Sequence, residues 1–418
     1  MRPSQRAPLV MRVGMLVLLG ILVSAGLAQT LGYQESVIAG GPDTFAEVRH
    51  VVLKGSNYEI GKKIGELAKR EGAQVKPSGD KILNRAKREY MAHDYPIHYQ
   101  RMRGLASSYG LNISNDSYDF TALFQPQVPF PGCSVVFFPA EHTENGHDIL
   151  SKNYDFPTGD IRTGRRLEKG KLAVMSRPYL FEIHPDQGYS SLSLCAFDYL
   201  GGVLDGINAK GLVVSILSVG ESAERAGYEP GREVGMHELM SMRYLLDTCQ
   251  NVEEAKTALL SLKHYYCLVP CHYIVADKTG KSFIFEFSHG RNRSYIIDGK
   301  GPQCITNHLV FQHAQTAEKQ KDNPSSSLRR YNTLEESIRA KKTFTLEEIA
   351  AINAKVAVPP EAPSNPEMAL NRTLWYAQYD LDNVALTVKF YLGEKPDTED
   401  NKRVILEYTP PRVYRLSR

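Results

Sequence analysis

Apolar residues repeat along the first part of the chain at two different spacings. Residues 46–53 (AEVRHVVL) are typical of a β-strand. A helix is expected to follow, because apolar side chains recur at helical spacing over residues 60–68, and Ser56 or Asn57 can cap it. Residues 81–110 form a second amphipathic stretch, which is also predicted to be helical.

A hairpin is predicted directly after Cys133. An Asn-Gly pair at 145–146, a strong turn signal, lies between two apolar runs at residues 134–139 and 148–154. Pairing across a two-residue turn would place Cys133 opposite a position near 158. The same pairing brings Asp155 to the same end of the ribbon as Cys133.

The remaining pattern predicts many short strands and a few helices. Strands are expected at 190–196, 202–207, 211–218, 375–379 and 384–391, in a hairpin over 272–287, and in a run that ends at 304–307. Helices are expected as a pair over 236–263, with Asn251 capping the second, and at 326–342 and 345–355. Consecutive strands with few intervening helices favour antiparallel sheets covered by helices over a parallel βαβ array.

The first 28 residues have the features of a secretory signal peptide. A basic start precedes an uncharged run over residues 13–28, with small residues at Gly26 and Ala28. This run has 16 residues, whereas a spanning helix needs about 20. Cleavage after Ala28 is therefore expected, giving a secreted or periplasmic protein without a stable membrane anchor; a retained anchor is the alternative.

Composition excludes several classes of protein. The chain has 418 residues, 42% of them hydrophobic and 23% charged, which is ordinary for a packed globular protein. Its 50 basic and 47 acidic residues give a net charge of only +3, so no nucleic-acid footprint is indicated. Six cysteines are too few for a disulfide scaffold. Cys267 and Cys271 are close enough in sequence to pair or to pack together.

Cys133 is the candidate nucleophile. It follows Gly132 and a Pro-rich segment, and the predicted hairpin brings Asp155 alongside. A thiol with a pKa of about 8.5 needs a base at neutral pH. If the Gly132–Cys133 bond were cut, the new α-amino group, with a pKa near 8, could accept the thiol proton. The alternatives are a packed core cysteine at 133 and a turn-closing Asp155.

Several short motifs share the order and spacing of a known group of enzymes. They are Gly55-Ser56-Asn57-Tyr58-Glu59-Ile60-Gly61 with Gly65, Arg103-Gly104-Leu105-Ala106, Gly132-Cys133-Ser134, Asn153-Tyr154-Asp155-Phe156, Gly206-Ile207-Asn208-Ala209-Lys210-Gly211-Leu212, Arg243-Tyr244-Leu245-Leu246, Val252-Glu253-Glu254-Ala255, Thr306-Asn307-His308 and Arg330-Tyr331. In these motifs the chain resembles the N-terminal nucleophile (Ntn) hydrolases. More narrowly, it resembles the linear amide C–N hydrolases that include choloylglycine hydrolases, penicillin acylases and acyl-coenzyme A:isopenicillin N acyltransferase-like enzymes.

The resemblance implies an α+β fold, the four-layer α-β-β-α sandwich of the Ntn hydrolases. It also implies a precursor that cuts itself between Gly132 and Cys133. Residues 29–132 would then be an α chain that stays bound to a β chain of residues 133–418, the two forming one domain.

The resemblance also implies roles for four residues. Cys133 would be the nucleophile and, through its freed α-amino group, the base. Asp155 would orient that amine, and the amide of Asn307 would donate to the tetrahedral oxyanion. Arg330 would hold the Asp155 side and the new N-terminus in place.

A second set of residues is expected to bind substrate or support the site: Lys152, Asn153, Asn208 and Ser218. Lys152 stands where bile-salt hydrolases carry an arginine, and a lysine keeps the charge but loses the planar fork that grips a carboxylate. Ser218 lies near the position of a second oxyanion donor in that branch. Both departures weaken a specific bile-salt assignment.

The resulting expectation is an exported, self-processing amidohydrolase acting on a small-molecule N-acyl amide through an acyl-thioester. No metal or organic cofactor is expected, since the spacing of His142 and His147 around a turn is unlike a zinc pair on one helix face. The alternatives are an acyltransferase, a papain-like cysteine peptidase and an exported binding protein without catalysis. A homo-oligomer is compatible with the sequence.

Overall fold

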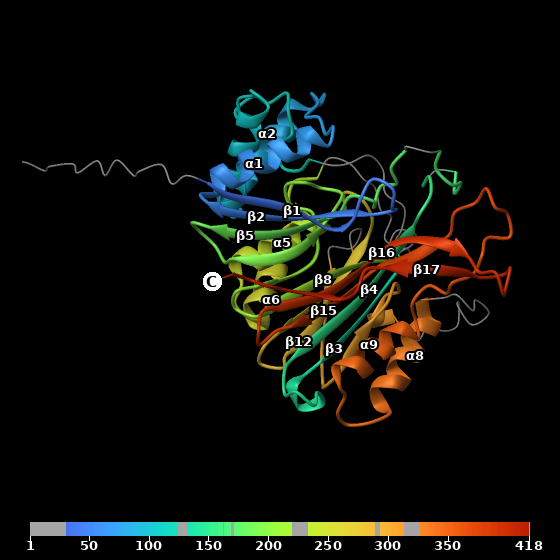
Figure 1. The fold of residues 1–418 in the computed structure, drawn as a ribbon. Helices are drawn as coiled ribbons and strands as arrows, with labels where there is room; N and C mark the ends of the chain where they lie inside the picture. The colour runs from blue at the N-terminus through green and yellow to red at the C-terminus, as the bar shows by residue number, and fades with distance from the viewer. Residues whose placement is uncertain are drawn as a thin grey trace, which may run out of the picture. The chain divides into compact units, whose positions relative to one another are not determined.

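Two β-sheets form the centre of the fold (Figure 1). The computed structural model describes residues 31–123, 132–161, 163–168, 171–219, 233–288, 293–312 and 327–417, so the predicted signal peptide lies outside them. Within these ranges the first sheet has nine strands: β1 (Gly32–Gly40), β2 (Glu47–Gly55), β5 (Tyr179–Pro185), β6 (Ser191–Cys195), β7 (Val203–Asn208), β8 (Leu212–Ser218), β11 (Cys271–Asp277), β12 (Ser282–Ser288) and β13 (Arg293–Asp298), in this order. Only the β2–β5 pair is parallel in this sheet as described.

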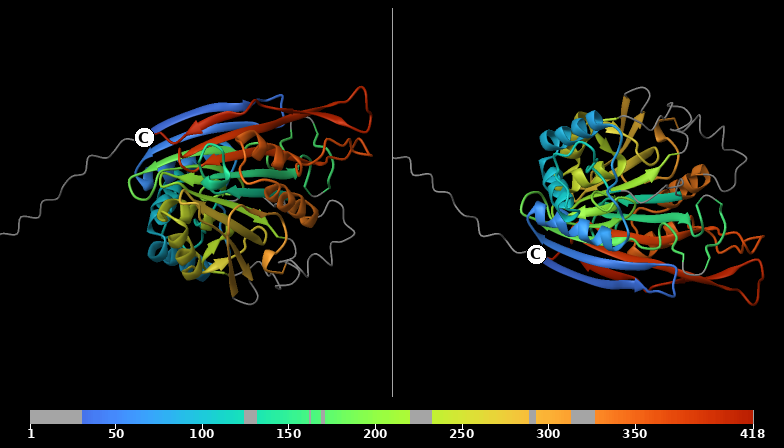
Figure 2. Two further views of the ribbon diagram at one scale, coloured as in Figure 1. Left: turned by 90° about the horizontal axis from the view of Figure 1, so that it is seen from below. Right: turned by 90° about the horizontal axis from the view of Figure 1, so that it is seen from above.

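The second sheet is antiparallel and carries Cys133. Its described strands follow the order β14 (Gln303–Ile305), β3 (Gly132–Phe138), β4 (Ile149–Pro157), β15 (Asn371–Asp380), β16 (Ala385–Pro396) and β17 (Val404–Tyr408), with β18 (Arg412–Arg415) also paired to β16. A separate short parallel pair joins β9 (Met236–His237) and β10 (His264–Tyr265). Strands β1 and β16 run side by side where the two sheets meet (Figure 2), and there Arg412 Nη1 donates to the Ile38 carbonyl at 3.1 Å.

Helices cover the outer faces of both sheets. The described α-helices are α1 (Asn57–Arg70), α2 (Lys81–Asp94), α3 (Pro96–Ser108), α5 (Glu238–Thr248), α6 (Val252–Ser261), α8 (Ser327–Arg339) and α9 (Leu346–Ala354), and two 3-10 turns are η1 (Ala140–His142) and η3 (Val310–Gln312). Helices α1, α5 and α6 pack on the first sheet, α8 and α9 pack on the second, and β3 contacts β8 between them (Figure 1). The expected four-layer α-β-β-α sandwich is therefore confirmed.

Two glycines of the quoted motifs explain how α1 and α3 approach each other. A Cβ at Gly61 would lie 2.1 Å from the Arg101 carbonyl oxygen, and one at Gly104 would lie 2.0 Å from the Tyr58 carbonyl oxygen. Neither position can hold a side chain without separating the two helices. Helix α1 begins as expected, because the side chain of Ser56 accepts from the Glu59 N–H.

The helical prediction over 81–110 needs one correction. The segment forms two helices, α2 and α3, with the break at Tyr95 and with Pro96 in the first turn of α3. Proline has no N–H to donate and disfavours helical backbone in the residue before it, so one helix ends and another begins there. The predicted pair over 236–263 forms α5 and α6, and Asn251 caps α6 by accepting from the Glu254 N–H at 3.0 Å.

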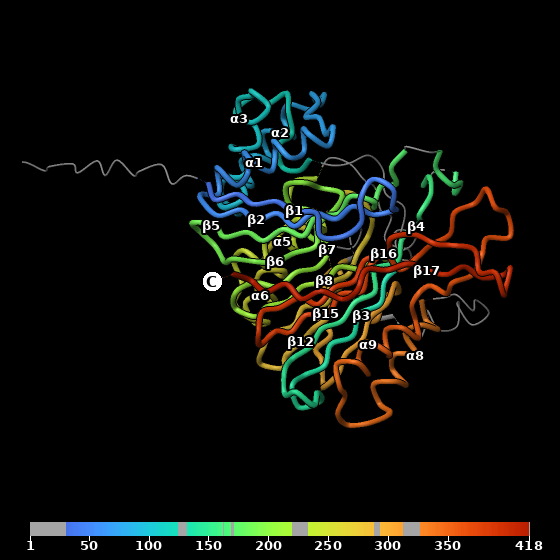
Figure 3. The backbone as a smooth tube through the Cα atoms, in the orientation of Figure 1, coloured from blue at the N-terminus to red at the C-terminus, as the bar shows by residue number. Residues whose placement is uncertain are grey.

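The hairpin after Cys133 forms with a different register from the predicted one. Strands β3 and β4 lie side by side (Figure 3), and Cys133 pairs with Tyr154 while Gly132 pairs with Asp155. The predicted partner near position 158 is wrong because the connection is not a two-residue turn: η1 and a turn at 143–146 separate the strands. The prediction that Cys133 and Asp155 share one end of the ribbon is confirmed.

The six cysteines, all within the described residues, are free thiols. Cys267 and Cys271 do not form a disulfide, and Cys271 Sγ instead donates to the Val269 carbonyl at 3.3 Å. Among the helices of the described ranges, none combines the length and apolarity needed to cross a bilayer.

Candidate active site

Cys133 is the second residue of β3, and it is 0% exposed. Across the ladder it pairs with Tyr154, whose ring stacks on Trp375 with ring centroids 4.0 Å apart. The preceding Gly132 lies against Asp155, since a Cβ at Gly132 would be 3.3 Å from the Asp155 Cβ. The two residues of the predicted scissile bond therefore lie opposite an acidic residue, Asp155, and an aromatic residue, Tyr154.

The backbone of Cys133 is held by two of the predicted site residues. Its N–H donates to Asn307 Oδ1 at 2.8 Å, and Arg330 Nη1 donates to its carbonyl oxygen. Arg330 Nη2 also donates to Asn307 Oδ1 at 2.7 Å. Two donors on this oxygen fix the orientation of the amide, so Asn307 Nδ2 faces the Ser218 carbonyl at 2.9 Å.

Asp155 completes the cluster from β4. Thr373 Oγ1 donates to Asp155 Oδ1 at 2.6 Å. Burial raises the pKa of Asp155 to about 6, and the charge of Arg330 together with the Thr373 hydrogen bond opposes that rise. The structure thus brings Cys133, Asp155, Asn307 and Arg330 together. Their catalytic roles remain predictions.

The thiol of Cys133 is poorly ionised in the intact chain. Burial raises its pKa to about 12, the positive charge of Lys152 acts in the opposite direction, and the negative charge of Asp155 adds to the rise. Since the thiolate is the reactive form, this thiol needs a proton acceptor immediately beside it. Burial also lowers the pKa of Arg330, and the negative charge of Asp155 opposes that change.

Lys152 is placed differently from a substrate-binding lysine. It is 0% exposed in β4 and its Nζ contacts three oxygens of the first sheet: the carbonyls of Leu204 (3.0 Å) and Ile216 (3.2 Å) and Asp205 Oδ2 (2.9 Å). Tyr379 OH donates to the other oxygen of Asp205. Two hydrogen bonds to backbone carbonyls and an ion pair with Asp205 therefore hold the Lys152 ammonium between the sheets, where it is not exposed to a substrate carboxylate.

The structure does not bring Asn153 and Asn208 to the cluster. Asn153 Nδ2 donates to the Asn353 carbonyl in α9, on the face of β4 opposite to that of its neighbour Lys152. Asn208 Nδ2 donates to the carbonyls of Leu246 (3.1 Å) and Cys249 (2.8 Å), which ties the end of β7 to the end of α5. In the uncut chain Asn153 and Asn208 thus contact backbone carbonyls away from Cys133, and their expected part in binding stays a prediction.

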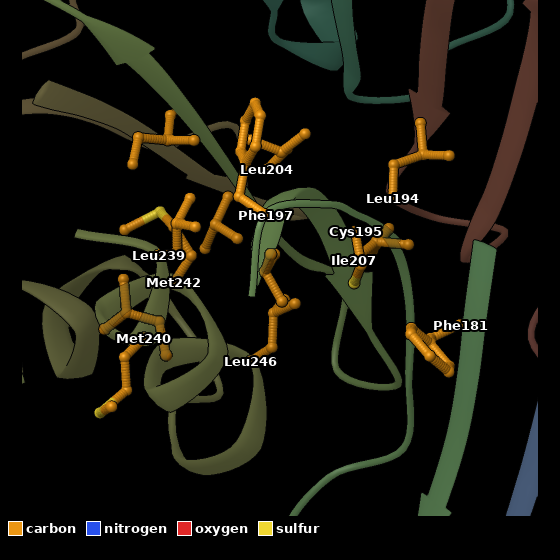
Figure 4. Packing of buried hydrophobic residues seen from close by; sticks show 14 of the residues in the cluster. Phe181, Leu194, Cys195, Phe197, Leu204, Ile207, Leu239, Met240, Met242 and Leu246 are labelled. Carbon is orange, nitrogen blue, oxygen red and sulfur yellow. The ribbon is translucent and has the colours of Figure 1, made fainter. Parts of the chain in front are cut away.

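A small apolar cavity of about 20 Å³ adjoins the cluster between the sheets. Its lining includes Tyr154 and Ser218 from the site, with Glu238 and the apolar side chains of Phe197, Leu204, Ile216, Leu239, Leu268, Val269 and Cys271. Figure 4 shows Phe197 and Leu204 next to Leu239 of α5. Phe197 has a φ of 70°, a conformation that costs a non-glycine residue about 1–3 kcal/mol and concentrates at functional sites.

Sequence reasoning missed the residues that support the predicted ones. Thr373 supports Asp155, and Ser327 Oγ accepts from the Asn307 N–H at 2.6 Å. Asp205 and Tyr379 hold Lys152. A threonine or serine far away in the chain carries no sequence signal for such a contact.

Sequence comparison places the chain in a family. A family model described as "Acyl-coenzyme A:6-aminopenicillanic acid acyl-transferase" matches residues 142–396. The chain belongs to this family. The match covers Asp155, Asn307 and Arg330 and begins nine residues after Cys133. Kinship with the choloylglycine hydrolase and penicillin acylase-like Ntn group is thereby confirmed.

Individual relatives of this acyl-transferase family member are distant. Penicillin V acylase of Pectobacterium atrosepticum is 28% identical over 140 residues, which are 31% of this chain and 37% of that protein. The chain thus aligns with little more than a third of that relative's length.

Solved structures give similarly distant matches. A mutant of conjugated bile acid hydrolase from Clostridium perfringens is 15% identical (68% of this chain, 96% of that chain, TM-score 0.43). Penicillin V acylase from Agrobacterium tumefaciens is 16% identical (62% and 83%, TM-score 0.40). The fold therefore rests on the strand order and layers described above.

Proposed function

We propose that this protein is an exported, self-processing Ntn amidohydrolase that cleaves a non-peptide linear C–N amide through an acyl-thioester on Cys133. Family membership and the cluster around Cys133 support this class of enzyme. Export rests on the signal-like residues 1–28. The proposed reaction uses the side chains around Cys133, the α-amino group of Cys133 that cleavage would free, and water.

One observation carries the proposal: the predicted site residues converge on the backbone of Cys133. Asn307 accepts from its nitrogen, Arg330 donates to its carbonyl, and Asp155 lies opposite the residue before it. In a papain-like site such partners would instead be gathered around the thiol. Gathering them around the backbone of Cys133 suits a residue whose own amine becomes the base.

Self-cleavage would proceed as an acyl shift. The thiol of Cys133 attacks the carbonyl carbon of Gly132, the C–N bond breaks, and the acyl group moves from nitrogen to sulfur. Water then hydrolyses the thioester, which releases Gly132 as a carboxylate and Cys133 with a free thiol and a free α-amino group. That amine would arise next to Asp155, whose charge could orient it.

Turnover would reuse the same atoms. The freed α-amino group takes the thiol proton while sulfur attacks the substrate carbonyl, and it passes the proton to the departing amine. The thioester is then hydrolysed by water. In the intact chain the buried thiol has a pKa of about 12, so a base formed only by cleavage would link activity to processing.

The cavity next to Tyr154 and Ser218 is lined mainly by aliphatic and aromatic side chains, with Ser218 and Glu238 as polar exceptions. Its volume of about 20 Å³ is room for about one water, so an acyl group does not fit it in the uncut chain. A relative named penicillin V acylase makes phenoxymethylpenicillin a reasonable first probe.

Acyl transfer is the second candidate function. The matched family is named for an acyl-transferase, and transfer differs from hydrolysis only in whether an amine or water attacks the thioester. Adding an acceptor amine such as 6-aminopenicillanic acid to a turnover assay separates the two. Formation of the N-acylated acceptor amine in place of the free carboxylic acid would favour the transferase.

The first test is the mass and N-terminal sequence of the purified protein beside a Cys133→Ala control. Two fragments, one beginning at Cys133 and both absent from the control, would support self-processing. Release of amine from phenoxymethylpenicillin or other N-acyl amides should then require Cys133. An uncut but active chain would point to a papain-like enzyme, and an uncut, inactive, folded chain to a binding protein.

A further inference from the structure

A buried histidine–glutamate pair lies behind the segment that carries Asn307. His272 of β11 and Glu286 of β12 are directly opposite each other in the sheet, and both side chains are 0% exposed. His272 Nδ1 lies 3.0 Å from Glu286 Oε1. The mechanism described above uses neither residue.

This pair contacts the chain on both sides of Asn307. On one side, His272 Nε2 lies 2.6 Å from the carbonyl oxygen of Thr306. On the other, Glu286 accepts from the backbone N–H groups of Val310 (2.7 Å) and Phe311 (3.1 Å).

The contacts of this pair form a continuous chain of hydrogen bonds. The Thr306 carbonyl can only accept, so His272 Nε2 donates to it. Nδ1 of the same ring faces Glu286 Oε1, and Glu286 accepts from the backbone N–H groups of Val310 and Phe311. The pair therefore links Thr306 to Val310 and Phe311, on either side of Asn307.

Asn307 needs such support because it lies beyond the end of a strand. Strand β14 ends at Ile305, and the backbone that follows is held through side chains. Ser327 Oγ accepts from the Asn307 N–H, while His272 and Glu286 hold the residues on either side. We propose that His272 and Glu286 are positioning residues that fix the Asn307 amide against the backbone of Cys133.

The inference rests on the proposed function for its kinetic consequence. Misplacing a reacting group or a donor by about 1 Å can cost about 10²-fold in rate. Loss of the pair should therefore lower kcat and slow self-cleavage, whereas KM should change little because both side chains are 0% exposed and cannot contact a substrate. General destabilisation would not produce that selective loss in the folded protein.

The kinetic test compares His272→Gln, Glu286→Gln and the double variant with the wild type. Each single change is expected to lower kcat at least 10-fold with KM within twofold, and the double variant should lose no more than the worse single one, because the two residues act as a unit. His147→Asn is the control, since it removes another histidine–carboxylate contact, with Asp380, near the opposite end of β4. Its kcat should be unchanged.

A structural test separates this inference from the proposed function. Crystal structures of uncut Cys133→Ala, with and without His272→Gln, report the distance from Asn307 Oδ1 to the backbone nitrogen of residue 133. Lengthening from 2.8 Å to beyond 3.5 Å would support the positioning role even if the wild type proved uncut and inactive. An unchanged distance, or a folded His272→Gln enzyme with kcat within twofold of the wild type, would overturn it.

Discussion

In the uncut chain, the backbone N–H of Cys133 donates to the side-chain oxygen of Asn307 at 2.8 Å. The nitrogen of the predicted scissile bond is therefore already paired with the residue that is expected to serve the oxyanion. Arg330 donates to the same amide oxygen, which keeps the Asn307 Nδ2 group on the side of Ser218. The side-chain amide of Asn307 therefore links the Gly132–Cys133 bond to Ser218 at the end of β8.

Replacing Asn307 with alanine should impair both processing and turnover. Loss of one preorganised oxyanion donor typically lowers kcat by about 10²–10³. Intact-mass measurements over time should show slower conversion to the Cys133 fragment, and released amine should fall by that factor at saturating substrate. Asn383→Ala, an exposed change near the opposite end of β4, should leave both unchanged. Equal losses of processing and turnover in Asn307→Ala and Asn383→Ala would contradict the role of Asn307 as an oxyanion donor.

Asp155 should reduce the stability of the uncut chain at neutral pH. Burial raises its pKa from 3.8 to about 6, so the folded chain binds a proton between these values that the unfolded chain has lost. The stability that this residue contributes is full below pH 3.8 and is lost as pH rises through 6. The full rise in the pKa of Asp155 corresponds to about 3 kcal/mol in the free energy of unfolding.

In a Cys133→Ala background, Asp155→Asn should therefore raise the free energy of unfolding at pH 8 and change it little near pH 3.5. Urea unfolding of the two proteins across this range measures the difference, and the other titrating groups cancel. Asparagine can still accept from Thr373, so that hydrogen bond is kept. A difference independent of pH would show that Asp155 is ionised with an ordinary pKa.

Much of the fold could be predicted because local patterns specify it. The cap at Ser56, the cap at Asn251 and the alternation of strands after Cys133 are short-range signals, and each led to a correct element. The break at Pro96 was also readable from local chemistry but was overlooked. Strand β5 was not predicted, because its parallel pairing with β2 is set by contacts more than a hundred residues apart.

The site could be predicted only as a list of residues. Cys133 and Asp155 were brought together by hairpin geometry, although the register was wrong by four residues. Asn307 and Arg330 came from family resemblance alone, since nothing local to either residue indicates contact with Cys133. The side chains that support them, such as Thr373 and His272, come from distant segments and are defined only by the folded packing.

Lys152 should matter for stability through its partner Asp205. Both side chains are 0% exposed, and removing one member of a buried ion pair usually costs about 3–5 kcal/mol because the other charge is left uncompensated. Lys152→Met should lower the free energy of unfolding by that amount in urea titrations of the uncut chain. Lys152→Met with Asp205→Asn should recover most of it, since asparagine is neutral and can still accept from Tyr379.

An exposed pair provides the comparison for this prediction. Lys341→Met removes a contact with Glu348 at the surface and should leave the urea midpoint almost unchanged. If Lys152→Met behaves like Lys341→Met, then the buried ion pair contributes no more to stability than the exposed one. If the double variant is no better than the single one, the loss comes from packing and not from an uncompensated charge.

The two fragments produced by cleavage should stay together. Strand β2, from the predicted α chain, pairs with β5 of the predicted β chain. Arg101 of α3 forms a fully buried ion pair with Asp247 of α5, with Nη1–Oδ2 at 2.6 Å and Nη2–Oδ1 at 3.2 Å. Native size-exclusion chromatography of the cut protein should therefore give one peak that contains both fragments.

Arg101→Met should weaken that association. It leaves Asp247 buried with Arg243 as its remaining cation, so we expect a loss of about 3 kcal/mol, or about 10²-fold in affinity between the fragments. Chromatography at increasing urea should then separate the fragments of Arg101→Met at a lower concentration than those of the wild type. Arg85→Met, which removes an exposed pair with Asp116 inside the α chain, should not shift that concentration. Equal shifts in both variants would mean that the sheet pairing, and not Arg101, holds the chains together.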